Sequence, residues 1–136
     1  MSIPILYRDE VPVVGYWQGL DDFNQPIDIY GDIEYKKGNL QPLKEGFQAS
    51  VDGSGIRYED WLVFYSTNDM VPTPPSEVPE GTEINSWWFW DYEESRWLAV
   101  QAYESWRRSG RGPKHLRAAG QYQAQTQPDV NDPVAQ

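Results

Sequence analysis

The sequence predicts a mainly β domain, because turn-forming residues divide the chain into short segments and those segments favour strands. Eleven glycines and eleven prolines are spread through 136 residues, and both residue types interrupt regular elements. Helical periodicity is scarce, whereas β-branched and aromatic residues, which are enriched in strands, occur in runs. A chain of this length typically forms one domain. We place it over residues 1–125, followed by a disordered tail over 126–136 that is rich in proline, aspartate and other polar residues.

Runs with the composition of strands follow one another along the chain. In residues 27–35 apolar side chains alternate, but the alternation breaks around Gly31, which predicts a β-bulge. Residues 82–92 and 96–106 are expected to form a hairpin, although the Glu, Arg, Ala and Gln content of 93–108 also favours a helix. The expected strands are 13–17, 27–35, 40–43, 57–66, 82–92 and 96–106, with a last strand or short helix over 116–125.

Two longer segments are expected to be loops that protrude from the domain. Residues 44–55 contain few apolar side chains, and residues 69–81 contain four prolines, which are incompatible with a regular element. The polar residues over 21–26 predict a shorter loop. Long loops of this kind are suited to contacts with neighbouring molecules.

The net charge of −10 is divided unevenly along the chain. Residues 1–105 carry six basic and 19 acidic side chains, or −13, whereas residues 106–117 carry five basic side chains and no acid. An acidic body repels nucleic acid. The basic stretch is suited to phosphates or to an acidic protein neighbour, and a solvated turn explains it equally well. Its basic residues are Arg107, Arg108, Arg111, Lys114 and Arg117.

The residue types that carry most catalytic chemistry are scarce. The chain has no cysteine and a single histidine, His115, so zinc–thiolate sites, cysteine nucleophiles and multi-histidine metal sites are excluded. The acidic residues over 91–94 lie at an expected hairpin tip, whereas glycosidase carboxylates face each other across a cleft. Residues 52–55 lack the acid spacing of a calcium loop. We therefore expect no enzymatic activity, cofactor or metal.

The N-terminal residues do not resemble a signal peptide, because a charged region followed by an apolar stretch is absent. No apolar run approaches the ~20 residues that a membrane-spanning helix needs. These features predict a protein made in the cytoplasm without a membrane partner.

The most unusual composition is the aromatic run Trp87-Trp88-Phe89-Trp90, in a chain with seven tryptophans, nine tyrosines and four phenylalanines. In a strand, Trp87 and Phe89 share one face while Trp88 and Trp90 share the other. Three interpretations follow. The run is buried on both faces within a closed barrel, it forms a subunit interface, or it provides a platform on which sugars or bases stack.

Three short segments of the chain occur in an informative order. They are Gly-Asn-Leu-Gln-Pro-Leu at 38–43, Gly-Ile-Arg-Tyr-Glu-Asp-Trp at 55–61 and Pro-Lys-His-Leu-Arg-Ala at 113–118. With strand-like sequence between them, they resemble the head-closure proteins of tailed bacteriophages, which are also called head–tail connector, neck or stopper proteins. The chain departs from that pattern in a longer proline-rich stretch at 71–81 and in Leu116, where the family often has an aromatic residue.

The resemblance implies a small closed or partly open β-barrel that acts as a structural protein of the virion neck. It implies a ring of about twelve or about six copies, placed between the portal or adaptor protein and a tail terminator or tail tube protein. Genomic DNA would pass through the channel without sequence-specific binding. As surfaces for such assembly we select the aromatic run and the basic stretch with the residue before it: Trp87, Trp88, Phe89, Trp90, Trp106, Arg107, Arg108, Arg111, Lys114 and Arg117.

Other functions compete with this reading. A tail terminator or tail-completion protein has a similar small barrel, so the position within the neck stays open. The density of Trp and Tyr also suits a carbohydrate-binding β module. An acidic inhibitor that mimics DNA is a third hypothesis, although the basic stretch argues against it.

Overall fold

A computed structural model of the chain describes residues 9–42, 60–67, 69–79, 81–106 and 115–133. Within these ranges it contains seven strands and is mainly β, as the sequence predicts. The strands are β1 (Asp9–Leu20), β2 (Pro26–Tyr30), β3 (Glu34–Pro42), β4 (Trp61–Ser66), β5 (Ser86–Asp91), β6 (Arg96–Trp106) and β7 (His115–Tyr122).

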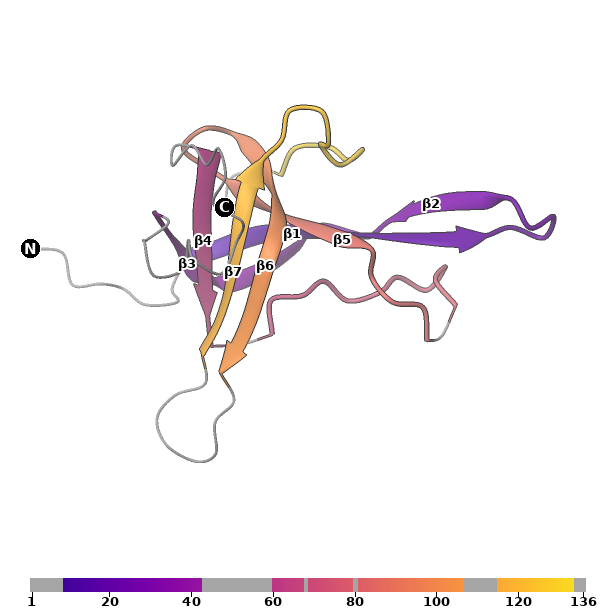
Figure 1. The fold of residues 1–136 in the computed structure, drawn as a ribbon, viewed down its shortest axis with the longest axis horizontal. Coiled ribbons are helices and arrows are strands. Elements are labelled where there is room, and N and C mark those ends of the chain that lie inside the picture. The colour runs from indigo at the N-terminus through magenta and orange to yellow at the C-terminus, as the bar shows by residue number, and fades with distance from the viewer. Residues whose placement is uncertain (1–8, 43–59, 68, 80, 107–114, 134–136) are drawn as a thin grey trace, which may run out of the picture.

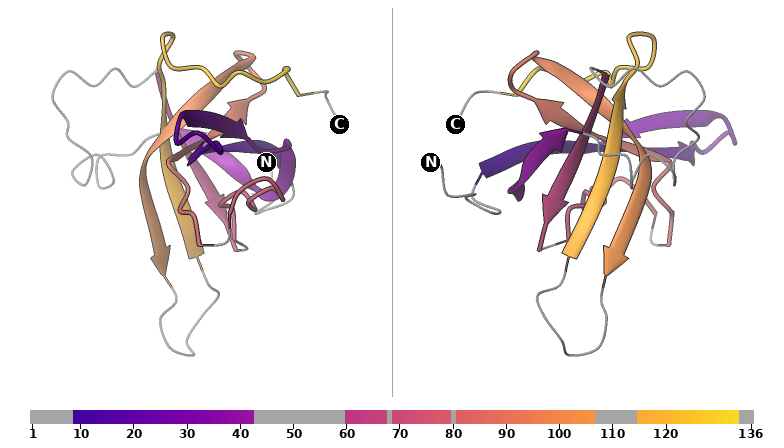
Figure 2. Two further views of the ribbon diagram at one scale, coloured as in Figure 1. Left: turned by 90° about the vertical axis from the view of Figure 1, so that its right-hand side faces the viewer. Right: turned by 60° about the vertical axis from the view of Figure 1, so that its left-hand side comes forward.

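Six of the strands in the described part of the chain form a closed antiparallel barrel, in the order β1-β3-β4-β7-β6-β5 and back to β1. Figure 1 and the two views of Figure 2 show the strands crossing around a common centre. Closure gives each of the six strands a neighbour on both sides over part of its length, which leaves few strand edges free to pair with another chain. Contacts of the barrel with other molecules must therefore use its side chains, its loops or elements that leave it.

Strand β1 (Asp9–Leu20) takes part in three pairings along its length. Residues 9–13 pair with β3, residues 13–16 with β5 and residues 16–20 with β2 (Pro26–Tyr30). Because β5 pairs with only the middle of β1, the second half of β1 continues past the barrel together with β2. The two strands project from the barrel as an arm (Figure 1).

The predicted bulge around Gly31 is confirmed, and it divides the expected strand 27–35 into two. Val13 pairs with Glu34 and Tyr16 with Tyr30, so two residues of β1 face three residues between β2 and β3. The Gly31 N–H still donates to the Gly15 carbonyl at 3.0 Å. An extra residue of this kind bends a strand and increases its twist, and here it lies where the arm leaves the barrel.

The barrel interior is filled by aliphatic and aromatic side chains from all parts of the wall. Phe64 of β4 and Phe89 of β5 are fully buried there, with ring centroids 5.6 Å apart. Two glycines make room for them, because a Cβ on Gly120 would lie 2.5 Å from the Phe89 ring and one on Gly38 would overlap the Phe64 ring. The buried members of this inner cluster are Val11, Val13, Phe64, Met70, Trp87, Phe89, Leu98, Leu116 and Ala118.

The expected hairpin is confirmed as β5 (Ser86–Asp91) and β6 (Arg96–Trp106). The competing helix is wrong for the described part of 93–108, since residues 96–99 pair with β5 and residues 98–106 pair with β7. The ambiguous last element is also a strand, β7. These segments have helix-favouring residues, but the hydrogen-bonded neighbours in a closed sheet override that preference.

The segment 69–81, which was expected to protrude, is anchored to the barrel at several points, while most of its other described residues are exposed. Met70 is fully buried in the inner cluster, and Pro72 and Val78 are buried as well. The backbone N–H and side-chain hydroxyl of Thr73 donate to the Glu34 carboxylate at 2.7 and 3.2 Å. The prolines prevent a strand, as expected, but they do not prevent the segment from packing against the barrel. Residues 44–55, the other expected loop, lie outside the described residues.

Candidate assembly surface

The aromatic run selected from the sequence is buried on both faces of β5. Trp87, Trp88, Phe89 and Trp90 have exposed fractions between 0 and 7%. Trp87 and Phe89 belong to the inner cluster, whereas Trp88 and Trp90 lie on the outer side of the wall. Of the three interpretations of this run, the structure shows burial within a closed barrel, and in this conformation none of the four side chains forms an exposed patch.

The remaining candidates do not form a described surface either. Trp106 and His115 pair at the end of β6 and β7, and Arg117 of β7 is partly buried opposite Tyr65 and Glu104. The other four basic candidates, Arg107, Arg108, Arg111 and Lys114, lie outside the described residues. Of the predicted interface residues, the structure therefore brings together only the aromatic run 87–90, and it buries that run inside the protein.

The outer tryptophans are covered by the C-terminal segment, which corrects the expectation of a disordered tail from residue 126. The indole N–H of Trp88 donates to the Thr126 carbonyl at 3.0 Å, and Val130 packs against the outer cluster. Residues 126–133 thus have a defined path over the barrel, while 134–136 lie outside the described residues. The outer cluster consists of Val14, Trp88, Trp90, Trp97 and Ala99, with Tyr16, Tyr30, Ile33 and Val130 packed against it.

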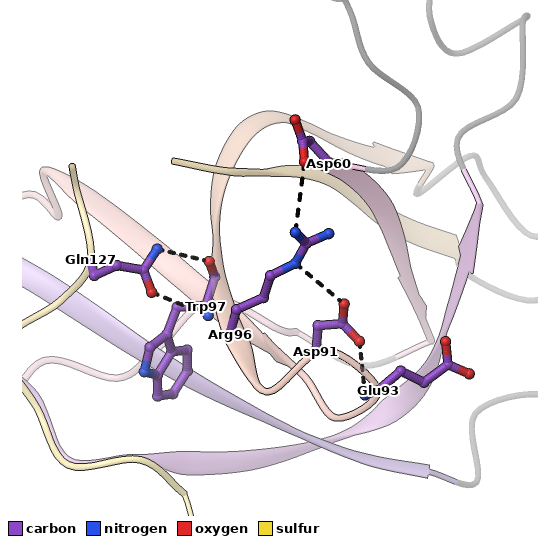
Figure 3. Close-up of polar contacts among 6 residues, drawn as sticks. All are labelled: Asp60, Asp91, Glu93, Arg96, Trp97 and Gln127. Atoms are coloured by element: carbon purple, nitrogen blue, oxygen red, sulfur yellow. Dashed lines mark hydrogen bonds and ion pairs between the residues drawn. The ribbon is translucent and has the colours of Figure 1, made fainter. Parts of the chain in front are cut away.

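The Gln127 side chain holds this segment against β6, because its amide bonds to the strand backbone as a neighbouring strand would (Figure 3). Its side-chain oxygen accepts from the Trp97 N–H at 3.3 Å, and its amide nitrogen donates to the Trp97 carbonyl at 3.1 Å. Trp97 lies one position beyond Leu98, which pairs with the last residue of β7, Tyr122. The Gln127 amide therefore satisfies backbone groups that β7 no longer reaches.

Three charged side chains, those of Asp60, Asp91 and Arg96, lie together beside the β5–β6 turn (Figure 3). The Arg96 guanidinium lies between two carboxylates, 3.6 Å from Asp60 and 3.7 Å from buried Asp91, and 4.6 Å from the centre of the Tyr122 ring. Asp91 also accepts the Glu93 N–H at 3.0 Å, which shapes the turn. Arg96 thereby links this turn to the start of β4 and the end of β7.

These carboxylates do not form the arrangement of a glycosidase. Asp91 is paired with a cation inside the protein, whereas Glu93 and Glu94 are exposed at the turn. Among the described residues no group of three or more His, Cys, Asp or Glu side chains is placed to hold a metal ion. The described chain also contains no helix with the length and apolar character needed to cross a membrane.

The exposed apolar side chains of the described surface gather on the arm. Phe23 at its turn is 81% exposed, Leu20 of β1 is 63% exposed and Ile27 of β2 is 39% exposed. Alongside them, residues 18–33 carry four aspartates and no basic residue. Leu20 pairs with Pro26 and Ile27 with Gly19, so the Leu20 and Ile27 side chains lie on opposite faces of the ribbon. The arm therefore exposes apolar side chains at its turn and on both faces, on an acidic projection.

The turn at the end of the arm is held by its own hydrogen bonds. One carboxylate oxygen of Asp21 accepts the N–H groups of Phe23 and Gln25, both at 2.8 Å. The Asp21 N–H donates to the Gln25 carbonyl at 2.9 Å, and Asn24 adopts a left-handed φ of 59°, which Asn tolerates better than most residues. These bonds fix the backbone from which the Phe23 side chain projects into solvent.

Contacts on both faces stabilise the root of the arm. Trp17 is fully buried, and its ring lies over Gly15 and Gly31, where a Cβ would come within 2.7 and 3.1 Å of it. On the other face the Tyr16 hydroxyl donates to the Asp28 carboxylate at 2.6 Å. This hydrogen bond, with some burial, raises the pKa of Tyr16 to about 12, because the phenolate form would lose the bond and face the negative charge of Asp28.

The arm was not among the sites predicted from the sequence. The loop predicted over 21–26 is confirmed for 21–25, whereas Pro26 begins β2. A usable signal was present, since Leu20, Phe23 and Ile27 place large apolar side chains around a cluster of turn-forming residues. Turns are ordinarily polar, so apolar residues there indicate a contact.

No family model matches the chain, and no curated protein or solved structure matches it. The fold and the surface described above are therefore the basis for the functional argument.

Replacing Gln127 by Ala is expected to lower the free energy of unfolding by about 1–2 kcal/mol, because both buried backbone groups of Trp97 lose their partner. Urea unfolding followed by tryptophan fluorescence measures this change. Gln125→Ala is the matched control, since Gln125 is exposed in the same segment and its loss should cost less than about 0.5 kcal/mol. Equal stability of the two variants would contradict an anchoring role for Gln127.

The Tyr16–Asp28 bond predicts a pH dependence at the root of the arm. Since the folded-state pKa, about 12, lies above the ordinary value of 10.0, the bond stabilises the fold fully below pH 10 and loses its effect as the pH rises through about 12. Asp28→Asn should move one tyrosine transition in an ultraviolet absorbance titration down from about 12. Asp22→Asn, which removes a charge elsewhere on the arm, should leave it in place. An unchanged transition in Asp28→Asn would refute the assignment.

Proposed function

We propose that this protein is a structural component of the neck of a tailed bacteriophage, without catalysis, which forms a ring between the portal or adaptor protein and the tail. The observation that carries the proposal is the arm: a rigid, acidic projection with exposed Leu20, Phe23 and Ile27 on an otherwise closed barrel. A closed barrel leaves few strand edges through which its sheet could extend to a neighbour. A projecting element that buries apolar area on another molecule serves that purpose.

The neck role and the position between head and tail come from the resemblance of segments 38–43, 55–61 and 113–118 to head-closure proteins. Gly38 lies in the first of these segments, where a larger residue would overlap Phe64 and the carbonyl of Tyr65. Arg117 and Ala118 of the third lie on the strand that closes the wall beside β4. These residues support a common architecture and contain no reactive group.

The charge of the protein suits a channel for DNA. The body over 1–105 carries −13, and an acidic wall repels phosphates, so DNA would pass without being held. A tail terminator also needs a channel wall that does not hold DNA, and the arm would serve a protein in the neck ring or at the tail terminator equally well. The carbohydrate-binding alternative loses its main support within the described residues, because the aromatic run that motivated it is buried.

Particles of the virus that encodes the chain provide the test. Electron cryomicroscopy and mass spectrometry of purified virions should place the chain in a ring below the portal. A nonsense mutation in its gene should yield heads that lose DNA or do not join tails, and supplying the intact gene should restore them. Complete, infectious particles that lack the chain would overturn the proposal.

A further inference from the structure

We propose that the outer edge of β2 binds an extended segment of another protein as a third strand of the arm, and that this segment carries a basic side chain between two apolar ones. The edge is formed by the backbone of Pro26–Tyr30. The strand addition is argued from the pairing, exposure and charge of the described residues. That the partner is a neighbouring protein of the virion neck rests on the proposed function.

The arm has one open edge and one edge that is capped near its root. In the described structure β2 lies at the end of the sheet with only β1 beside it, and Figure 1 shows no described segment along its other side. On the opposite edge Asn85 takes the place of a strand. Its N–H donates to the Tyr16 carbonyl at 2.9 Å, and its side-chain oxygen accepts the Gln18 N–H at 2.7 Å.

The hydrogen bonds at the two ends of the β1–β2 pair fix its phase. In an antiparallel ladder, residue pairs that exchange N–H···O bonds alternate with pairs that do not. At the root the Gly31 N–H donates to the Gly15 carbonyl at 3.0 Å, and at the turn the Asp21 N–H donates to the Gln25 carbonyl at 2.9 Å. These two pairs are an even number of residues apart on each strand, so every second pair between them is a bonded one.

This phase decides which backbone groups of β2 lie on its open side. The N–H and carbonyl groups of Ile27 and Ile29 point toward β1. Those of Asp28 and Tyr30 point away from β1, together with the Pro26 carbonyl. The open edge therefore presents alternating donors and acceptors in the spacing with which a further strand pairs. Pro26 has no N–H, so the donors end before the turn.

Charge decides which kind of strand fits this edge. Asp28 is exposed, and residues 18–33 carry four aspartates and no basic residue. A second copy of the chain is a poor partner, because the antiparallel pairing that overlaps two β2 strands fully places Asp28 opposite Asp28 of the other copy. Like charges directly opposite each other destabilise a sheet, whereas opposite charges stabilise it. The edge therefore favours a different protein, with Lys or Arg opposite Asp28.

The neighbours of Asp28 define the rest of the pattern. Ile27 is 39% exposed and Ile29 is partly buried, and both side chains lie on the face of the ribbon opposite Asp28. A Cβ on Gly19 would lie 3.7 Å from each of them, so they gather over this glycine. Apolar side chains beside them on an added strand would extend this face and bury more of it. The favoured partner sequence is therefore apolar-basic-apolar.

The strand is held in an extended form before any partner binds. The Asp28 carboxylate accepts the Tyr16 hydroxyl through Oδ1 at 2.6 Å, and a carboxylate has further acceptor sites for a basic group. The Asp21 bonds fix the turn. An edge that is already ordered loses little conformational freedom on binding. In strand addition the backbone bonds supply affinity and the alternating side chains supply specificity.

Nuclear magnetic resonance of the 15N-labelled full chain tests the edge with three capped peptides. The first has the sequence Thr-Val-Lys-Val-Thr, the second has Glu in place of Lys, and the third is the first with its Lys nitrogen methylated. The Lys peptide should shift the amide signals of Asp28 and Tyr30 and bind about fivefold more tightly than the Glu peptide at low salt, a difference that salt should reduce. The methylated peptide should not bind, because it lacks the N–H that faces the Asp28 carbonyl.

Two variants separate the charge from the edge itself. Asp28→Asn should bring the Lys and Glu peptides to nearly equal binding, whereas Asp22→Asn, at the exposed turn, should leave the preference in place. No shift at Asp28 and Tyr30 with the Lys peptide, or equal binding of the methylated peptide, would overturn the strand addition. An unchanged preference in Asp28→Asn, or shifts at these amides that depend on protein concentration without peptide, would overturn the assigned partner.

These outcomes are distinct from the test of the neck function. If the chain is present in the neck but the peptides leave β2 unchanged, the strand addition is wrong and the neck function stands. If the Lys peptide pairs with β2 but the chain is absent from particles, the neck function is wrong and the strand addition stands.

Discussion

The pairing of β1 with three different strands is the constraint on which the rest of the structure depends. Its first residues close one side of the barrel with β3, and residues 13–16 complete the circle with β5. The extra residue near Gly31 then bends the ribbon away, and the buried Trp17 ring fixes the bend against Gly15 and Gly31. Barrel closure and arm projection therefore have the same origin. A change that shifted β1 by one residue would turn its core-facing side chains outward and would also misplace the arm.

Closure also explains why so acidic a chain holds so many aromatic residues. With β5 between β1 and β6, Trp87 and Phe89 fill the interior while Trp88 and Trp90 face outward. The outer pair needs a cover, and the C-terminal segment provides one through Thr126, Gln127 and Val130. The aromatic run is thus a two-sided core element, and the surface left for other molecules is elsewhere.

Most of the fold could be predicted from local patterns. The break at Gly31 and the Trp-rich hairpin are visible because strand periodicity and turn residues are local signals. The cover over Trp88 was missed, since a polar segment such as 126–133 reveals its packing only through contacts distant in sequence. The anchoring of Met70 was missed for the same reason. The strand over 27–35 was predicted from its alternation, but its projection from the barrel was missed, because local patterns do not show where a pair of strands lies relative to the core.

The proposed function depends on shape and charge: we expect the arm to contact other molecules and the aromatic strands to stabilise the fold. Hydrogen exchange compares the arm and the Trp-rich strand directly, residue by residue, in the free and the assembled chain. We expect backbone amides of 19–27 to gain protection on assembly, while those of 86–91 are protected in both states. New protection confined to the Trp-rich strand, with an unchanged arm, would contradict this division and return the interface to the aromatic run.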